Sequence, residues 1–397
     1  MTALKGIRVL DFTRVLSGPY CTMTLGDLGA EIIKIENPDG GDDSRTFNIS
    51  KSRPISTYFY AVNRNKRSVT IDFRKKEGRN AILALVKGVD VVVENFRTGV
   101  MERYGLGYEE LSAINPKLVF CSISAYGREG PLKGRPGYDP IVQAESGFMS
   151  QTGEENGAPM RTGVSMMDIV TGLFAGQAVL GALLARDRVG RGQKIDVPLF
   201  DTAVNMLHHA GSAYLLDDIV MPRVGNGNLV AQPVGMYQAS DGPFMITLTN
   251  NRLWRVFCEV GLLRSDLVED PLYHDNTARV ANRLALEDLL NSIFATDTRA
   301  HWITKLGAAG IPAGEVRDVG QALESMEVAA RELVTQQAHP VYDDVRGIRS
   351  PMNLSETPVV DPVAAPDLGA DTDAVLRALA NYDDAAIGAM RKAKAIL

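Results

Sequence analysis

The residue whose position most suggests covalent chemistry is Asp168. It ends the segment Gly163–Asp168 and stands near the start of a long apolar stretch, which we predict to be a helix from about Met166 to Arg186. The N-terminal end of a helix favours a negative charge by roughly 0.3–1 kcal/mol, and an ionised carboxylate can attack a carbonyl carbon as a covalent nucleophile. An aspartate in the first turn can also merely cap the helix. The spacing alone favours this second interpretation, so both stay open.

A second group of candidate residues is basic and lies beside predicted strands. The segment Asn63–Ser68 concentrates arginine, lysine and asparagine just before one strand, and Asn95 and Arg97 follow another. In an open parallel sheet, ligands bind beyond the carboxyl ends of the strands, which is where Asn95 and Arg97 would lie. A ligand that carries phosphate would suit these side chains. A solvated charged loop has the same composition, and composition alone favours that alternative.

Several other chemistries are not supported by the pattern of residues. The five histidines are scattered, with no HxxxH or HExxH spacing and no cysteine cluster, so no metal site is predicted. The segment Gly163–Ser165 begins like the nucleophile elbow of a serine hydrolase but lacks the closing glycine. No P-loop is present and no GxGxxG follows the first predicted strand, and Gly225–Gly227 is a weak GxG that favours a turn.

Composition narrows the class of protein. The 397 residues carry a net charge of -6, with 42 basic and 48 acidic residues, which argues against a nucleic-acid partner. Three widely spaced cysteines and the lack of a signal-like N-terminus predict a reducing, cytoplasmic setting. The apolar stretch 169–185 is shorter than the about 20 residues that a membrane span needs. We therefore expect a buried helix there and no membrane partner.

Strands and helices alternate over the first half of the chain. We predict strands over Ile7–Phe12, Glu31–Ile35, Ser68–Phe73, Val89–Glu94, Lys117–Ile123 and Gln193–Leu199, with helices that include Tyr20–Gly29, Glu77–Lys87 and Asp201–Leu216. Such alternation favours parallel pairing with right-handed crossovers, so we predict the α/β class with an open, doubly wound sheet. The turn-forming residues Val224–Asn228 indicate a domain boundary. Strand pairs followed by helices beyond it indicate a smaller α+β domain.

Several motifs occur together in a specific order. They are Gly6–Thr13 with Ser17–Pro19, Leu28–Glu36, Asn63–Ser68, Val93–Arg97, Gly137–Asp139 and Gly190–Gln193. In these motifs, and along nearly its whole length, the chain resembles the family III CoA-transferases of the CaiB/BaiF group, such as formyl-CoA transferase. The resemblance implies a large Rossmann-like domain built from both chain ends (1–220 and 326–397), a small α+β domain (225–325), and a homodimer whose subunits interlock.

The same resemblance assigns roles to individual residues. Asp168 matches the family's nucleophile, which forms an aspartyl anhydride with the donor acyl group and then an aspartyl-CoA thioester. The positions that contact CoA correspond to Val15, Arg74, Asn95, Phe96, Val100, Arg103, Tyr138 and Asp139. Arg74 and Arg103 are chemically suited to the phosphate and ring of the adenosine part. Acyl-CoA, CoA and a small carboxylic acid are thus expected as substrates, with no permanently bound cofactor.

Two departures from the family pattern bear on the acids exchanged. Formyl-CoA:oxalate transferases have a run of glycines where this chain has Asn226–Pro233, and a glutamine where it has Leu16. We therefore expect a different acyl pair, with succinyl-CoA or a similar dicarboxylic acyl-CoA as the donor.

Two other functions stay open. A 2-methylacyl-CoA racemase has the matching aspartate but pairs it with a histidine where Tyr138 stands. Racemisation needs two proton-transfer groups, and a tyrosine with a pKa of about 10 is a poor base at neutral pH. The third possibility is a non-catalytic acyl-CoA-binding protein, in which Asp168 would have no chemical role.

Overall fold

The computed structural model describes residues 1–49 and 56–397. The chain divides into two compact units. Unit 1 comprises Met1–Phe148, Thr162–Ser212 and Glu327–Leu397, and unit 2 comprises Met149–Arg161 and Ala213–Met326. Residues 149–161 and 213–220, which the sequence analysis assigned to the large domain, therefore group with unit 2.

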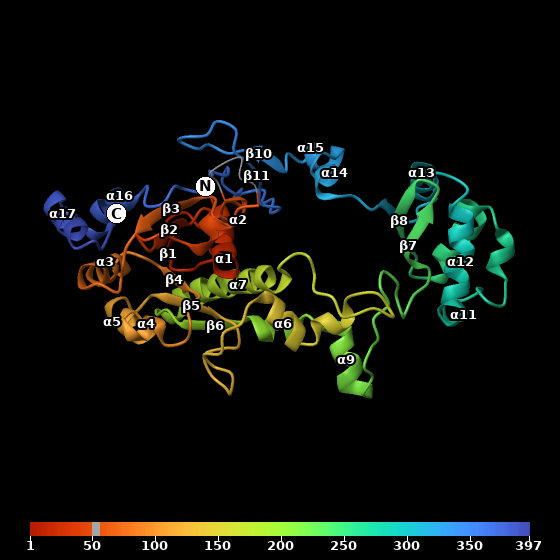
Figure 1. The fold of residues 1–397 in the computed structure, drawn as a ribbon, viewed down its shortest axis with the longest axis horizontal. Helices are drawn as coiled ribbons and strands as arrows, with labels where there is room; N and C mark the ends of the chain where they lie inside the picture. The colour runs from red at the N-terminus through yellow and green to blue at the C-terminus, as the bar shows by residue number, and fades with distance from the viewer. Residues whose placement is uncertain (50–55) are drawn as a thin grey trace. The chain divides into compact units, whose positions relative to one another are not determined.

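Unit 1 is built on a six-stranded parallel sheet (Figure 1). Its strands are β1 (Arg8–Asp11), β2 (Glu31–Glu36), β3 (Lys66–Thr70), β4 (Val91–Glu94), β5 (Val119–Ser124) and β6 (Lys194–Pro198). The spatial order β3-β2-β1-β4-β5-β6 confirms the predicted doubly wound sheet, because the chain moves outward in one direction from β1 and in the other direction from β4. The switch point between β1 and β4 is where such sheets bind ligands.

Helices cover both faces of this sheet. They are α1 (Ser17–Asp27), α2 (Thr57–Val62), α3 (Lys76–Val86), α4 (Val100–Arg103), α5 (Tyr108–Ile114), α6 (Asp139–Glu145), α7 (Met166–Val189) and α8 (Leu199–Asn205), followed by α9 (His208–Asp217), which runs into unit 2. The prediction of one helix over Asp201–Leu216 was wrong. His208 has a φ of 48°, a left-handed conformation that a helix cannot continue through, so α8 and α9 are separate.

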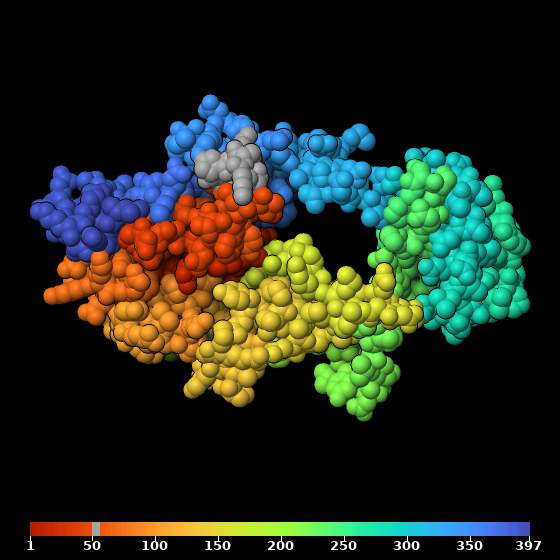
Figure 2. All heavy atoms as spheres, in the orientation of Figure 1, coloured from red at the N-terminus to blue at the C-terminus, as the bar shows by residue number. Residues whose placement is uncertain are grey.

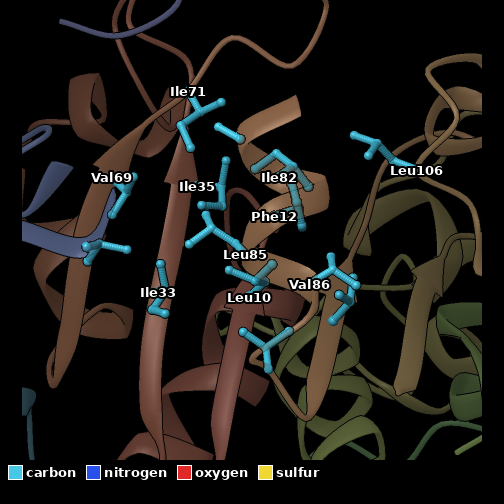
Figure 3. Close-up of a cluster of buried hydrophobic side chains, with 14 of the residues drawn as sticks. Leu10, Phe12, Ile33, Ile35, Val69, Ile71, Ile82, Leu85, Val86 and Leu106 are labelled. Atoms are coloured by element: carbon cyan, nitrogen blue, oxygen red, sulfur yellow. The ribbon is translucent and has the colours of Figure 1, made fainter. Parts of the chain in front are cut away.

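The core forms because neighbouring residues of a strand point to opposite faces. Val9 and Ile32 belong to a cluster with α1 and α7, whereas the adjacent Leu10 and Ile33 belong to a cluster on the other face with α3. Figure 3 shows this second cluster, where the strand residues meet Ile82, Leu85 and Val86 of α3. Burial on both faces explains why consecutive residues are apolar in β1 (Val9 and Leu10), β2 (Ile32 and Ile33) and β4 (Val91–Val93).

The C-terminal end of the chain completes the second cluster. Helices α16 (Thr372–Ala380) and α17 (Asp384–Lys392) contribute Val375, Leu376, Ile387 and Met390 to it. Figure 2 shows this part of the chain packed against the N-terminal strands and helices. Unit 1 also contains the antiparallel strands β10 (Val334–Gln336) and β11 (Arg346–Ile348) and the 3-10 helix η1 (Asp43–Thr46).

Helix α7 crosses α1 at a very short distance. A Cβ atom added to Gly172 would lie 2.6 Å from the carbonyl oxygen of Ser17, so only glycine fits at this crossing. Among the described residues, α7 is the one helix long and apolar enough to span a membrane. The helix is only partly buried: Met167, Ala175 and Val179 lie in the core, whereas Leu173, Phe174 and Leu184 are exposed.

Unit 2 contains an antiparallel sheet of β7 (Val234–Ala239), β8 (Gly242–Thr247) and β9 (Ala313–Glu315). Its core includes Phe244, Trp254, Phe294 and Trp302 and is formed with residues of α10 (Asn251–Val256), η3 (Phe257–Leu262), η4 (Ser265–Val268), α12 (Arg283–Phe294) and α13 (Arg299–Ala308). Unit 2 also contains α11 (Asn276–Ala281) and α14 (Val319–Leu323), and the boundaries between the units fall within η2 (Phe148–Gln151) and α15 (Met326–Ala330).

Candidate active site

A cavity of about 640 Å³ opens at the carboxyl ends of the parallel strands of unit 1. The loops that follow β1, β2, β3, β4 and β5 all contribute to its lining, through 12–14, 37–43, 71–74, 95–103 and 124–127. The segment 134–138 completes the wall. This is the position at the topological switch point that the strand order favours for a ligand.

Six of the eight residues expected to contact CoA line this cavity. They are Arg74, Asn95, Phe96, Val100, Arg103 and Tyr138. The structure thus brings together side chains that are up to 64 positions apart in the sequence, because each follows a strand of the same sheet. Val15, Asp139 and Asp168 are not part of the lining.

The basic segment Asn63–Ser68, which suggested a phosphate site, has a structural role instead. The Arg64 guanidinium is buried against the carboxylate of Asp27 at 2.5 Å. The Lys66 ammonium is fully buried and lies 2.9 Å from the carboxylate of Asp11. The same ammonium also donates to the carbonyl of Pro19 and to the hydroxyl of Thr22, at 2.9 and 2.8 Å. A buried ammonium is tolerated only when it is paired, and here Asp11 at the end of β1 supplies the opposite charge.

The loop 12–17, which follows β1 and includes the first residue of α1, joins the cavity to Asp168. Phe12, Thr13 and Arg14 line the cavity, and the Asn95 side chain holds Arg14 by accepting a hydrogen bond from its N–H (2.9 Å) and donating one to its carbonyl (2.8 Å). At the other end of the loop, the side chain of Ser17 forms a hydrogen bond with the carboxylate of Asp168. One short segment therefore contacts both parts of the site.

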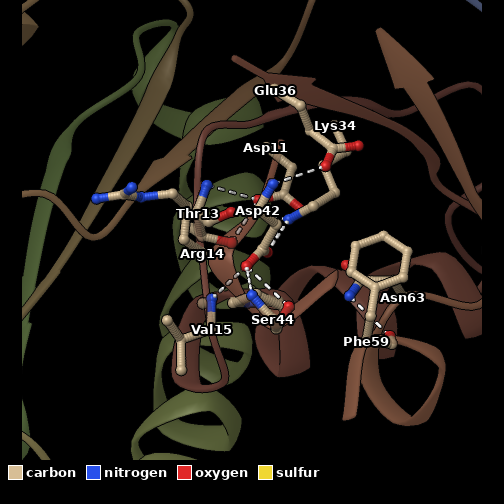
Figure 4. A network of polar contacts seen from close by, with 12 residues as sticks. Asp11, Thr13, Arg14, Val15, Lys34, Glu36, Asp42, Ser44, Phe59 and Asn63 are labelled. Carbon is tan, nitrogen blue, oxygen red and sulfur yellow. Dashed lines mark hydrogen bonds and ion pairs between the residues drawn. The ribbon is translucent and has the colours of Figure 1, made fainter. Parts of the chain in front are cut away.

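Val15, in the middle of this loop, has a φ of 68°, which is a costly conformation for a β-branched residue. The loop is held there by Asp42, whose Oδ1 accepts the Val15 N–H at 3.1 Å (Figure 4). Lys34 pairs with the other oxygen of Asp42 at 2.9 Å and donates to the carbonyl of Thr13 at 2.8 Å. Both charged side chains are fully buried, so the ion pair fixes the loop from beneath.

The pKa values of this pair reflect their mutual stabilisation. Burial by itself would raise the pKa of Asp42, but the Lys34 ammonium and the Ser44 donors outweigh it and hold that pKa well below its usual range. Burial would lower the pKa of Lys34, and the carboxylates of Asp42, Asp11 and Glu36 outweigh it and raise that pKa. The pair is therefore ionised at neutral pH.

Asp168 occupies the third position of α7 and is partly exposed. Burial and the nearby carboxylate of Asp139 raise its pKa from 3.8 to about 7, against the opposing effect of the Ser17 hydrogen bond. Burial and Asp139 therefore outweigh the preference for a negative charge that was expected from the start of the helix. A partly desolvated carboxylate of this kind is more reactive than one in bulk water once it is ionised.

Asp139 also occupies the hydrogen-bond donors at the start of α7. Its Oδ2 accepts hydrogen bonds from the backbone N–H groups of Met167 (2.7 Å) and Asp168 (3.2 Å). Gln143 donates to the other oxygen at 2.5 Å and accepts the N–H of Thr162 at 3.0 Å. Asp139 therefore caps α7 from another element and consumes the donors that would stabilise a charge on Asp168. Its predicted contact with CoA stays a prediction.

Sequence reasoning missed several residues of the site. Gln143 and Tyr58 carry no local motif, and they reach the site only through folding. Tyr58 lies near enough to Asp168 that the carboxylate, after burial, raises the pKa of the phenol. Ser17 stood in a recognised motif, but nothing in its spacing indicated that it bonds to a residue 151 positions away.

Comparison with known proteins identifies the family of this chain. Residues 4–372 match the profile of CoA-transferase family III. The chain is 37% identical over 387 residues to a mouse protein named succinyl-CoA:glutarate CoA-transferase, covering 98% of this chain and 88% of that one. It is 40% identical over 350 residues to acetyl-CoA:oxalate CoA-transferase of Acetobacter aceti, covering 85% and 90%.

A solved structure of the same family has a similar fold. The structure of a CAIB/BAIF family protein from Brucella suis superposes with a TM-score of 0.86 at 37% identity, over 95% of this chain and 99% of that one. A cavity at the switch point, a carboxylate at the start of α7 and these whole-length matches lead to one conclusion: the chain belongs to CoA-transferase family III and is a CoA-transferase.

Proposed function

We propose that this enzyme transfers CoA from succinyl-CoA, or a similar dicarboxylic acyl-CoA, to a second small carboxylic acid, with Asp168 as the covalent nucleophile. The nucleotide part of CoA binds in the cavity of unit 1, and the thioester end reaches Asp168. The observation that carries this proposal is the loop 12–17, because it lines the cavity at one end and bonds the Asp168 carboxylate at the other.

The reaction then proceeds by two exchanges at one carboxylate. An oxygen of ionised Asp168 attacks the thioester carbonyl of the donor, the carbon–sulfur bond breaks, and a mixed anhydride and the CoA thiolate form. The thiolate attacks the Asp168 carbonyl carbon, which releases the donor acid and leaves an aspartyl-CoA thioester. The acceptor carboxylate and the thiolate repeat these two steps in reverse order, which yields the new acyl-CoA and regenerates Asp168.

The choice of a dicarboxylic donor is supported by the names of relatives. Proteins from mouse, human and Haloarcula hispanica that are 35–37% identical over 90–98% of this chain are named as succinyl-CoA transferases to glutarate or mesaconate. The absence of a glycine run in Asn226–Pro233 also argues against an oxalate-type site. One relative is nevertheless named for oxalate, so oxalate belongs among the acceptors to be tested.

The test is to trap the intermediate. After incubation with succinyl-CoA alone, hydroxylamine should convert Asp168 to a hydroxamate, which mass spectrometry of the peptide detects, and Asp168→Ala should show no adduct while still binding CoA. Transfer to glutarate, mesaconate, malate and oxalate would then be compared. Absence of any adduct, with turnover intact in Asp168→Ala, would refute the mechanism.

The Asp168→Ala variant and a deuterium-uptake assay distinguish the transferase from the other two functions. A racemase would incorporate solvent deuterium at the α-carbon without exchanging acids, but no histidine lines the cavity among the described residues, and Tyr138 is 69% exposed. A non-catalytic binding protein would be indifferent to Asp168→Ala. No observation favours either.

We also propose that the chain forms a homodimer, as the family resemblance implies. Helix α7 exposes Leu173, Phe174 and Leu184, which are 48%, 39% and 64% accessible, and a second copy would cover such apolar side chains. Light scattering after gel filtration should give twice the monomer mass, and a mass of about 43 kDa would contradict it.

A further inference from the structure

Unit 1 contains a second cavity, of about 650 Å³, which shares no lining residue with the cavity assigned to CoA. Helices α1 and α2 form one wall, through residues that include Tyr20 and Tyr60, and the segment 333–351, which contains β10 and β11, forms the other. Strand β11 lies beside α2 (Figure 1). Sites that bind small molecules usually measure about 300–1,000 Å³, so this cavity is large enough for a ligand.

The two walls of the second cavity are tied together by a histidine. The Nδ1 atom of His339 accepts the backbone N–H groups of Val341 (3.1 Å) and Tyr342 (3.2 Å), so the proton of the neutral ring is on Nε2. That nitrogen lies 2.8 Å from the hydroxyl oxygen of Tyr60 in α2 and donates to it. The cavity is therefore formed by the fold itself.

The lining of the second cavity is largely apolar and carries an excess of positive charge. Its apolar side chains are Met23, Ala61, Leu333, Val345, Ile348 and Pro351. Within residues 1–49 and 56–397, its charged residues are three arginines, and no acid lines it. Arg64 is held by the carboxylate of Asp27, whereas Arg346 and Arg349 have no side-chain partner in the same part of the chain. An anion with an apolar body would suit this lining.

Gln337 points independently to a ligand. The residue is 4% exposed and lines the cavity, and its side-chain amide has no hydrogen-bond partner in the part of the chain that the structure describes. The amide packs against Gly347 of β11 so closely that a Cβ atom added there would lie 2.1 Å from the amide nitrogen. An unpaired buried amide is costly, and a carboxylate in the cavity would accept its N–H groups.

We propose that the second cavity binds a carboxylate that has an apolar chain. The Gln337 amide and the guanidinium groups of Arg346 and Arg349 hold the carboxylate, because charged donors form the stronger hydrogen bonds to it. The chain lies against Met23 and Ala61. This inference goes beyond the proposed function, since neither Asp168 nor any residue expected to contact CoA lines the cavity.

The first experiment is calorimetry of the full chain with octanoate and with octan-1-ol, which has the same chain but no charge. Saturating CoA is present, so the first cavity is occupied. The double variant Arg346→Gln/Arg349→Gln keeps the size of both side chains and removes their charges. The matched control is Arg79→Gln, which changes an exposed arginine of α3 that has no carboxylate partner among the described residues and lines neither cavity.

Octanoate should bind the wild type, and the double variant should weaken that binding by about tenfold or more, as loss of charge-assisted hydrogen bonds does. Binding of octan-1-ol should be the same in both proteins, and Arg79→Gln should bind both compounds like the wild type. The proposal is overturned if the wild type binds no octanoate up to about 1 mM, or if the double variant binds it equally well.

A second pair of variants tests the place of binding. Ala61→Trp puts a large ring on the cavity wall at an exposed position of α2, and Ala385→Trp puts the same ring at an exposed position of α17 that does not line the cavity. Octanoate binding should disappear in the first variant and persist in the second. Binding that persists in Ala61→Trp would refute the proposal.

One further result would also refute it. If the wild type binds no octanoate while Ala61→Trp halves the mass measured by light scattering, the cavity holds part of a second copy of the chain instead of a small molecule. Circular dichroism establishes that each variant is folded, and the double arginine variant decides the question if Ala61→Trp does not fold.

Discussion

Removal of the negative charge at residue 168 should stabilise the folded protein while abolishing turnover. Asp168 is held where burial and Asp139 raise its pKa from 3.8 to about 7. The substitution Asp168→Asn keeps the shape of the protonated side chain but leaves a group that cannot ionise. It therefore removes a charge that the folded state tolerates poorly and that the unfolded state, where water solvates the carboxylate, tolerates well.

The size of the effect follows from linkage. Between pH 3.8 and about 7 the folded protein binds more protons at this group than the unfolded chain, so the wild-type free energy of unfolding falls as pH rises. A shift from 3.8 to about 7 corresponds to about 4 kcal/mol. Since the side chain is partly exposed, water screens part of this, and we expect a gain of about 2–3 kcal/mol at pH 8 and about 1 kcal/mol at pH 5.

The assay is urea unfolding of wild type and variant at pH 5 and pH 8, at one protein concentration. The matched control is Asp201→Asn, because Asp201 also stands at the third position of a helix, α8, but is exposed. The control should change stability by less than about 0.5 kcal/mol at both pH values. If the gain from Asp168→Asn is the same at pH 5 and pH 8, or equals that of the control, the desolvated carboxylate is not what we infer.

Three further predictions concern the site and its supports. The single-turnover rate of adduct formation should rise with pH through about 7 and level off above it, because only the ionised nucleophile attacks; a rate already constant from pH 5 would contradict this pKa. Gly172→Ala should impair folding and activity, since its Cβ would lie 2.6 Å from a carbonyl of α1, whereas Gly181→Ala on the same helix, with nothing within 4 Å, should stabilise by up to about 1 kcal/mol; equal effects in thermal melts would disprove the close crossing. Lys34→Met should cost about 3–5 kcal/mol because it leaves the buried carboxylate of Asp42 without its cation, and denaturant titration showing under about 1 kcal/mol would show that the pair does not hold the loop.

The alternation of apolar strands with helices was enough to predict the sheet. Residues such as Val9 and Leu10 must be buried on opposite faces, and a strand that is apolar on both faces has few alternatives to the middle of a parallel sheet. The ordered motifs also indicated the family, and with it Asp168 and the residues expected around CoA. These are local properties, or properties of order along the chain, which the sequence carries directly.

Other properties depend on partners that are far apart in the sequence. The composition around Lys66 suggested a phosphate ligand, but its ammonium pairs with the carboxylate of Asp11, 55 positions earlier in the chain. The place of Asp168 in a helix also does not reveal its pKa, because burial and then the nearby carboxylate of Asp139 raise it, and Asp139 accepts the N–H groups at the start of α7. A hydrogen-bond donor serves one acceptor well, so which acceptor it serves, and therefore which charge is left for chemistry, is decided only when the chain has folded.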